Sequence, residues 1–119
     1  PRLAALHVAE GVTEAEGLAL AAALQAGSEH PLARGVLARF GDAPLPTVEA
    51  FRALPGRGVS GMVGGRTLLL GSPRALQDSG APPGALAARA EAEAALGRTP
   101  AWLVETAPAP RVLALLAFE

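Results

Sequence analysis

Apolar side chains recur at helical spacing in two neighbouring segments near the start of the chain. In residues 14–26, Ala and Leu recur every three or four positions, which predicts a helix with one face packed on a neighbour. A Thr-x-x-Glu capping box opens it, and Gly27 is expected to end it in a left-handed conformation. A second helix is expected to start at Pro31 and to stop at Gly41. The two predicted helices therefore meet at a short elbow.

Short apolar runs bounded by glycine or proline predict strands in much of the remaining chain. The predicted strands are residues 3–8, 47–54, 59–63, 66–70, 101–106 and 111–118. Two more helices are expected at 73–79 and 82–96. Because helices come in pairs and strands in meanders, the prediction is an α+β fold: a mostly antiparallel sheet of about six strands flanked by two helical hairpins. Residues 1–119 are expected to form a single domain, since a domain averages roughly 150 residues.

Composition argues against several functions. Ten basic and eleven acidic residues give a net charge of −1, so no basic surface for nucleic acid is expected. There is no lysine for a P-loop, no cysteine for a thiolate metal site, and no apolar stretch long enough to span a membrane. The few histidines and aspartates are His7, His30, Asp42 and Asp78. We therefore expect no catalytic residue and no metal ligand in the chain.

A glycine-rich loop at residues 56–61 is the first candidate for ligand binding. Its Gly-Arg-Gly-Val-Ser-Gly string fits the dinucleotide pattern G-x-G-x-x-G, but an extended segment follows where that motif needs a helix. The protein-kinase glycine loop also fits, but it requires a lysine on the next strand. What remains is a loop in which Gly56 and Gly58 leave backbone amides open to a ligand, with a plain turn as the alternative.

His30, at the predicted start of the second helix, is the second candidate. Alone, it would be a partly exposed capping residue. Three strings, however, occur in one order of elements: Ser-Glu-His-Pro-Leu-Ala at 28–33, Gly-Arg-Gly-Val at 56–59 and Leu-Gly-Ser at 70–72. Together they resemble the nucleotide-binding domain (N-domain) of the heavy-metal-transporting P-type ATPases, the copper and zinc/cadmium/cobalt pumps. The resemblance covers essentially the whole chain, and the Ser-Glu-His-Pro-Leu string is its most specific part.

The resemblance implies a twisted antiparallel sheet that holds ATP and presents the γ-phosphate to an aspartate of another domain. His30 would lie against the adenine ring, and Val59 would touch the base from the other side. Gly56 and Gly58 would line the path of the adenine and the phosphates. Gly71 would let the ribose and phosphates approach the end of a strand. Mg²⁺ would arrive with the nucleotide.

Two positions depart from the family's pattern. The family usually has Glu five residues before the histidine, where it accepts a hydrogen bond from the adenine amino group, and here that residue is Gln25. An amide accepts this bond more weakly and can also turn to donate, which would relax the preference for ATP over GTP. An exposed helix residue is the alternative. Ser72 stands where the family often has Asn, and a helix cap alone would explain it. Glu29 is expected to be exposed, with a role in orienting His30 as the alternative.

The chain contains no Asp-Lys-Thr-Gly string, which carries the phosphorylated aspartate of the family. The expectation is therefore an N-domain excised from a larger membrane pump, soluble and monomeric when isolated, on the cytoplasmic side, and unable to turn over ATP alone. Its partners would be the phosphorylation and actuator domains of the parent chain. One alternative is a regulatory or interaction module of the same fold with degenerate nucleotide affinity. A small stand-alone enzyme is a further alternative, which the missing Lys and Cys disfavour.

Overall fold

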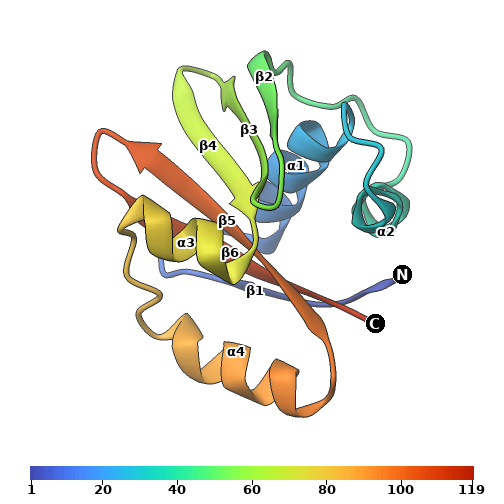
Figure 1. The fold of residues 1–119 in the computed structure, drawn as a ribbon. Helices are drawn as coiled ribbons and strands as arrows, with labels where there is room; N and C mark the ends of the chain where they lie inside the picture. Colours follow the sequence, from blue (N-terminus) through green and yellow to red (C-terminus); the bar gives the residue numbers. More distant parts are fainter.

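The computed structural model describes residues 1–119 and contains one β-sheet with helices on both faces (Figure 1). The elements in chain order are β1 (Leu3–Val8), α1 (Glu14–Gln25), α2 (Pro31–Phe40), β2 (Glu49–Leu54), β3 (Gly58–Val63), β4 (Arg66–Gly71), α3 (Pro73–Ser79), α4 (Leu86–Ala95), β5 (Thr99–Ala107) and β6 (Arg111–Phe118). The six strands follow the order β1-β6-β5-β4-β3-β2, and every neighbouring pair is antiparallel. The predicted α+β fold with its antiparallel sheet is confirmed.

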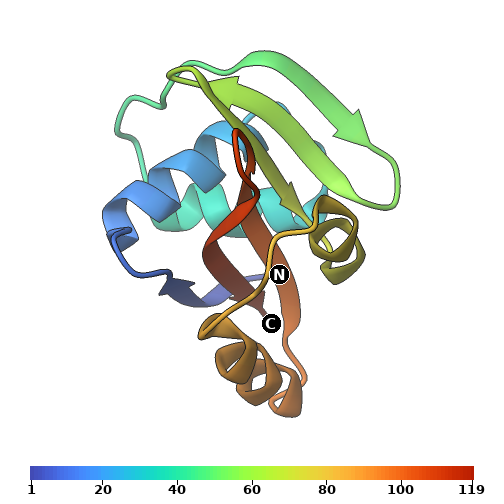
Figure 2. The ribbon, with the colours of Figure 1, turned by 90° about the vertical axis from the view of Figure 1, so that its left-hand side faces the viewer.

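The helices cover the two faces of the sheet in pairs (Figure 2). α1 and α2 pack on each other and on one face, while α3 and α4 lie on the other face and each contact β5. Leu68 and Leu70 of β4 belong to the core beneath α1 and α2, whereas Leu69 belongs to the core beneath α3 and α4. Successive side chains of a strand point to opposite faces, so this continuous apolar run is buried on both sides. None of the helices is long and apolar enough to cross a membrane.

Local signals at helix ends gave mixed results. The capping box is confirmed in part, because Thr13 Oγ1 accepts a hydrogen bond from the Glu16 N–H at 3.1 Å. The prediction for Gly27 is wrong: the C-cap of α1 is Ala26 in a right-handed conformation, and Gly27 is not among the glycines with positive φ. The last helix begins at Leu86, later than predicted, with no side-chain cap.

A chain of ion pairs joins α4 to both ends of the protein. Glu93 on α4 accepts a hydrogen bond from Arg98 Nη1 at 2.7 Å and pairs with His7 Nε2 at 3.2 Å. Arg98 continues to Glu119 at 3.6 Å, and Glu119 pairs with Arg2. The main chains of Arg2 and Glu119 also bond to each other through two N–H···O contacts of 2.9 and 3.0 Å. The two ends of the chain therefore lie side by side, as Figure 1 shows.

Stability is expected to fall in acid partly through Glu93. The hydrogen bond from Arg98, and then the one with His7, lowers the pKa of Glu93 below its ordinary value of 4.5. A carboxyl whose pKa is lower in the folded chain stabilises the fold above its unfolded pKa, and this contribution is lost as the pH falls through the folded pKa. As the pH is lowered below 4.5, we expect the urea concentration at the unfolding midpoint of the wild type to fall. The fall should be smaller for Glu93→Gln. Equal acid sensitivity of the two proteins would contradict this role for Glu93.

Candidate functional site

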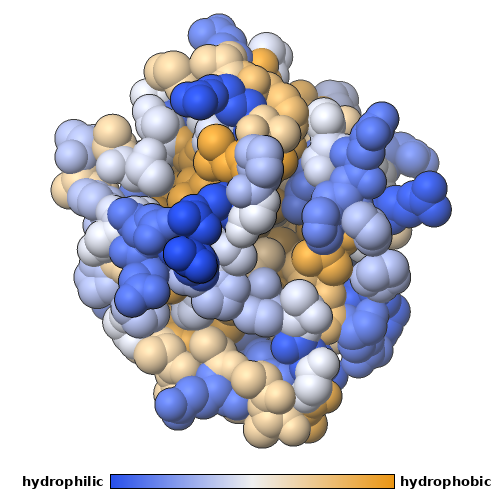
Figure 3. All heavy atoms as spheres, in the orientation of Figure 1, coloured by the Kyte–Doolittle hydropathy of each residue, from blue (hydrophilic) through white to orange (hydrophobic).

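A cleft of about 770 Å³ lies between the elbow that joins α1 to α2 and the strands β2, β3 and β4. The start of β5, Ser72 and the first residue of α3 complete its lining. This volume is typical of small-molecule sites, and Figure 3 shows apolar surface in the hollow between α2 and the strands. All eight residues predicted for the site line this cleft: Gln25, Glu29, His30, Gly56, Gly58, Val59, Gly71 and Ser72. Three sequence strings that lie far apart along the chain therefore meet in one place.

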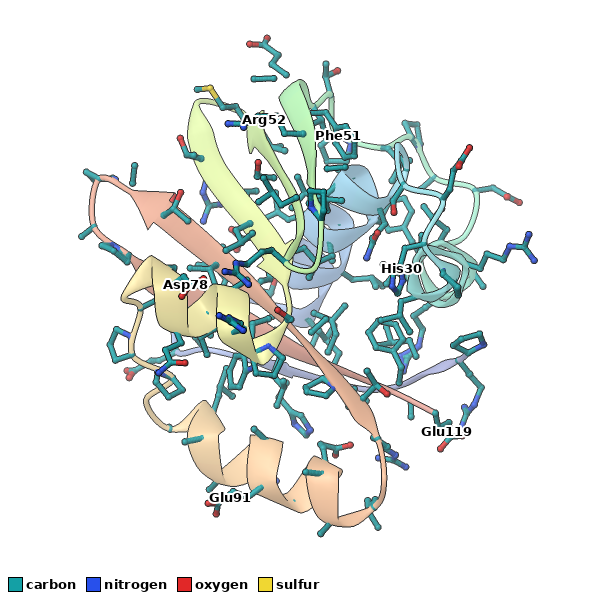
Figure 4. All side chains as sticks on the ribbon, viewed as in Figure 1. His30, Phe51, Arg52, Asp78, Glu91 and Glu119 are labelled. Carbon is teal, nitrogen blue, oxygen red and sulfur yellow. The ribbon has the colours of Figure 1, made fainter.

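Local hydrogen bonds at the elbow fix the position of His30. The Oγ of Ser28 accepts from the His30 N–H, and His30 Nδ1 accepts from the Leu32 N–H, each at 3.1 Å. His30 is thus the N-cap of α2, and Pro31 follows it at the first helical position. Because Nδ1 accepts a hydrogen bond, the proton of the neutral ring is on Nε2. The ring itself is exposed at the cleft (Figure 4), so its capping role leaves one face and the Nε2–H available to a ligand.

Gln25, the last residue of α1, is buried at the cleft rather than exposed on the helix. Only 6% of its surface is accessible, and its Oε1 has no hydrogen-bond partner. A buried acceptor without a donor costs about 1–3 kcal/mol of stability. Gln25 therefore presents an open hydrogen-bond acceptor at the cleft.

Replacing Gln25 by an apolar side chain is expected to stabilise the domain. Gln25→Met keeps the length of the side chain and removes the unsatisfied acceptor, so we expect the free energy of unfolding to rise by about 1 kcal/mol. The matched control is Gln77→Met, because Gln77 is exposed and the change there should stay within about 0.5 kcal/mol. Urea unfolding measures both values. A loss of stability in Gln25→Met would show that the amide is satisfied in the folded protein.

Gly58 and Gly71 are opposite each other in the β3–β4 pair, and both must be glycine for a structural reason. A Cβ on Gly58 would lie 2.1 Å from the Leu70 carbonyl oxygen, and one on Gly71 would lie 2.4 Å from the Arg57 carbonyl oxygen. We expected glycine here to make room for a ligand. The close approach of the two strands already explains it, so the absence of a side chain at these positions is not evidence for a ligand.

The other four predicted residues have distinct local roles. Gly56 has a φ of +73° with no atom near its missing Cβ, as a tight turn requires. Val59 is buried in the main core beneath the cleft. Ser72 caps α3, since its Oγ accepts from the Ala75 N–H at 3.2 Å. Glu29 is exposed and forms no ion pair or side-chain hydrogen bond, so it does not orient the neighbouring histidine through a direct bond.

The cleft carries little positive charge. Arg57 is the one basic residue in its lining besides His30, and its Nε pairs with Asp78 Oδ2 at 2.9 Å. Arg57 is therefore an ion-paired residue rather than a free cation at the cleft. No group of three or more His, Asp or Glu side chains is placed to hold a metal ion. The phosphates of a ligand near Arg57 would therefore meet mainly backbone groups.

Sequence reasoning missed Phe51, an exposed aromatic side chain that also lines the cleft. It lies on β2, where we predicted a strand without assigning a function to either face. The available signal was composition: the chain has only three phenylalanines, and this one is in a strand with polar and alanine neighbours.

No family model matches the chain. Among curated proteins, it is 42% identical over 72 residues to the zinc/cadmium/lead-transporting P-type ATPase of Escherichia coli, which covers 59% of this chain and 10% of that protein. It is 38% identical over 104 residues to copper-transporting ATPase 2 of Rhizobium meliloti, covering 86% of this chain and 13% of the relative. The copper-exporting P-type ATPase of Mycobacterium tuberculosis is 41% identical over 98 residues, 82% of this chain and 12% of the relative. The chain thus spans little more than a tenth of the length of these proteins.

Solved structures agree with these relatives. A crystal structure of a zinc-transporting PIB-type ATPase matches with a TM-score of 0.82 and 32% identity, covering 98% of this chain and 18% of that one. The N-domain of HMA8, a copper-transporting P-type ATPase, matches over the full length of both chains with a TM-score of 0.76; at 19% identity this shows the fold alone. By sequence and by fold, this chain belongs to the N-domains of the heavy-metal P-type ATPases.

Proposed function

We propose that this domain binds ATP in the cleft and presents the γ-phosphate to an aspartate in another domain of a heavy-metal pump. The observation that carries the proposal is the unpartnered Oε1 of Gln25 at the cleft. The exocyclic amino group of adenine is a hydrogen-bond donor on a flat apolar ring. The amino group would supply the donor that Gln25 Oε1 lacks, and the ring would contact the apolar residues of the cleft.

His30 supports this placement of the base. Its ring is held by the cap on α2 and leaves an exposed face at the cleft, five residues after Gln25 in the chain. Val59 and Leu70 are buried apolar residues in the lining of the same cleft. Stacking of a base on an aromatic side chain contributes about 1–3 kcal/mol. The base end of the nucleotide would therefore supply most of the binding energy.

The phosphate end would be held loosely. Arg57 is already paired with Asp78, so the triphosphate would meet few free positive charges, and Mg²⁺ would enter bound to the nucleotide. Weak binding of the nucleotide suits a domain that positions ATP for a reaction carried out by another domain. The aspartate carboxylate of the phosphorylation domain would attack the γ-phosphorus, and ADP would leave. This chain would supply the base contact that orients the nucleotide.

The partners we propose follow from the family. The matched relatives are several times longer and transport copper or zinc, cadmium and lead. We therefore propose the phosphorylation and actuator domains of one parent chain as its partners, on the cytoplasmic side where ATP is available. Alone, the domain is expected to bind ATP as a monomer without hydrolysing it.

A calorimetric titration with ATP, AMP and GTP tests the proposal. We expect saturable ATP binding with a Kd of about 0.1–1 mM, equivalent to about −5.5 to −4.1 kcal/mol. AMP should bind within about tenfold of ATP, because the base supplies most of the contact energy. Absence of binding at several times this concentration would instead support a regulatory or interaction module of the same fold.

A further inference from the structure

The strand β2 contains a bulge directly before Phe51. Glu49 lies opposite Met62, but Arg52 lies opposite Ser60, so that β2 has one residue more than β3 across this interval. The extra residue adopts an unusual conformation: Ala50 has a φ of +53° and is the one non-glycine residue of the chain with positive φ. Such bulges re-aim side chains, and backbone strain of this kind is often retained at ligand sites.

The bulge brings two apolar side chains to the same face of the sheet: Val48, just before β2, and Phe51, within it. Val48 packs on the core beneath α1 and α2, and its Cγ1 would meet a Cβ placed on Gly61. Phe51 is three positions later and would point to the opposite face of a regular strand. It instead packs against Gly27 at the end of α1, where an added Cβ would lie 3.3 Å from the ring. The extra residue in β2 therefore turns Phe51 toward the α1–α2 elbow.

Phe51 is held there but not covered. It is 37% exposed and lines the same cleft as Gln25 and His30. Figure 4 shows Phe51 on the α2 side of β2 and His30 at the start of α2. Four large apolar side chains of the protein are exposed, namely Leu45, Phe51, Met62 and Leu96, and of these Phe51 alone lines the cleft.

We propose that Phe51 is a second aromatic contact for the base, aimed into the cleft by the bulge at Ala50 and seated on Gly27. This proposal rests on nucleotide binding in the cleft and specifies the class of base. A face-on contact with a phenyl ring gains energy with the π-area of the ligand, so purine nucleotides bind more tightly than pyrimidine nucleotides. The phosphates take no part in this contact.

The test compares Phe51→Ala with a matched variant. Met62→Ala removes an equally exposed side chain, also 37%, from the neighbouring strand and outside the cleft. We expect Phe51→Ala to weaken ATP binding about tenfold, which corresponds to about 1.4 kcal/mol, and Met62→Ala to leave it unchanged. Phe51→Tyr should bind ATP as the wild type does, and the weak binding of inorganic triphosphate should be equal in all four proteins. In NMR spectra, the Phe51 ring protons should show contacts to the H2 or H8 proton of bound ATP.

Each failure has a distinct meaning. A wild type that does not bind ATP overturns the proposed function, and the role of Phe51 with it. A wild type that binds ATP while Phe51→Ala binds equally well overturns the role of Phe51 alone. Parallel losses of ATP and inorganic triphosphate binding in Phe51→Ala would also overturn it, because they would indicate a disturbed fold rather than a lost base contact.

Discussion

Gly58→Ala is expected to destabilise the domain by about 3–5 kcal/mol, enough to unfold much of a marginally stable protein. Two costs add at this position. The φ of +139° lies outside the range that side chains adopt easily, and the new Cβ would lie 2.1 Å from the Leu70 carbonyl oxygen. That oxygen belongs to the neighbouring strand in the middle of the sheet, so the contact can be relieved only by moving β3 away from β4.

Gly56→Ala separates the two costs, because Gly56 lies in the same turn with a φ of +73° and open space where its Cβ would be. We expect it to cost only about 1–2 kcal/mol, the penalty of a left-handed alanine. Urea unfolding of the two variants gives the comparison. Similar losses at both positions would mean that the close approach of β3 and β4 is not what requires glycine at Gly58.

The largest expected effect on binding comes from His30. Removing its ring should weaken ATP binding about 10- to 100-fold, the equivalent of losing one stacked base contact. His30 is also the N-cap of α2, so His30→Ala would lose about 1 kcal/mol of stability as well. His30→Asn keeps a capping side chain and removes only the ring. Calorimetry and urea unfolding on both variants distinguish the two roles.

The two substitutions should therefore agree in binding and differ in stability. If His30→Asn binds ATP as tightly as the wild type and only His30→Ala is weak, the histidine acts solely as a cap. Exposed capping residues are common in proteins, and His30→Ala removes the cap and the ring together. The comparison with His30→Asn is therefore needed to assign a loss of ATP binding to the ring.

The fold followed from local patterns because those patterns are independent of distant contacts. The capping residues Thr13 and Ser72 mark helix starts, and short apolar runs bounded by glycine or proline mark strands. The prediction for Gly27 was wrong because a tertiary contact, not a helix end, explains the glycine: the Phe51 ring packs where a side chain would be. The bulge at Ala50 has the same origin, since it depends on how β2 meets β3. A single sequence contains no local signal for either contact.

The sequence predicted which residues meet at the cleft, but not the burial, strand distances and hydrogen bonds that surround them. Motifs at the elbow, the glycine turn and the end of β4 come together at the cleft because the antiparallel order of the sheet brings them there. The burial of Gln25 was not predicted, because the single apolar face expected for α1 did not mark it, whereas the structure buries nearly every residue of the last two turns of α1. The reasons for glycine at Gly58 and Gly71 likewise required the distance between the strands.

The measurement that tests the central claim most directly is an NMR titration of the ¹⁵N-labelled wild-type domain with ATP. We expect saturable shifts concentrated at the elbow and the glycine turn, including the side-chain amide of Gln25, the amide of His30 and the backbone of Gly56 and Gly58. Gly64 and Gly65, in the turn at the opposite end of the β3–β4 pair from the cleft, should not respond. Shifts that avoid the cleft, or no saturable shift at several millimolar ATP, would contradict the assignment of this cleft as the nucleotide site.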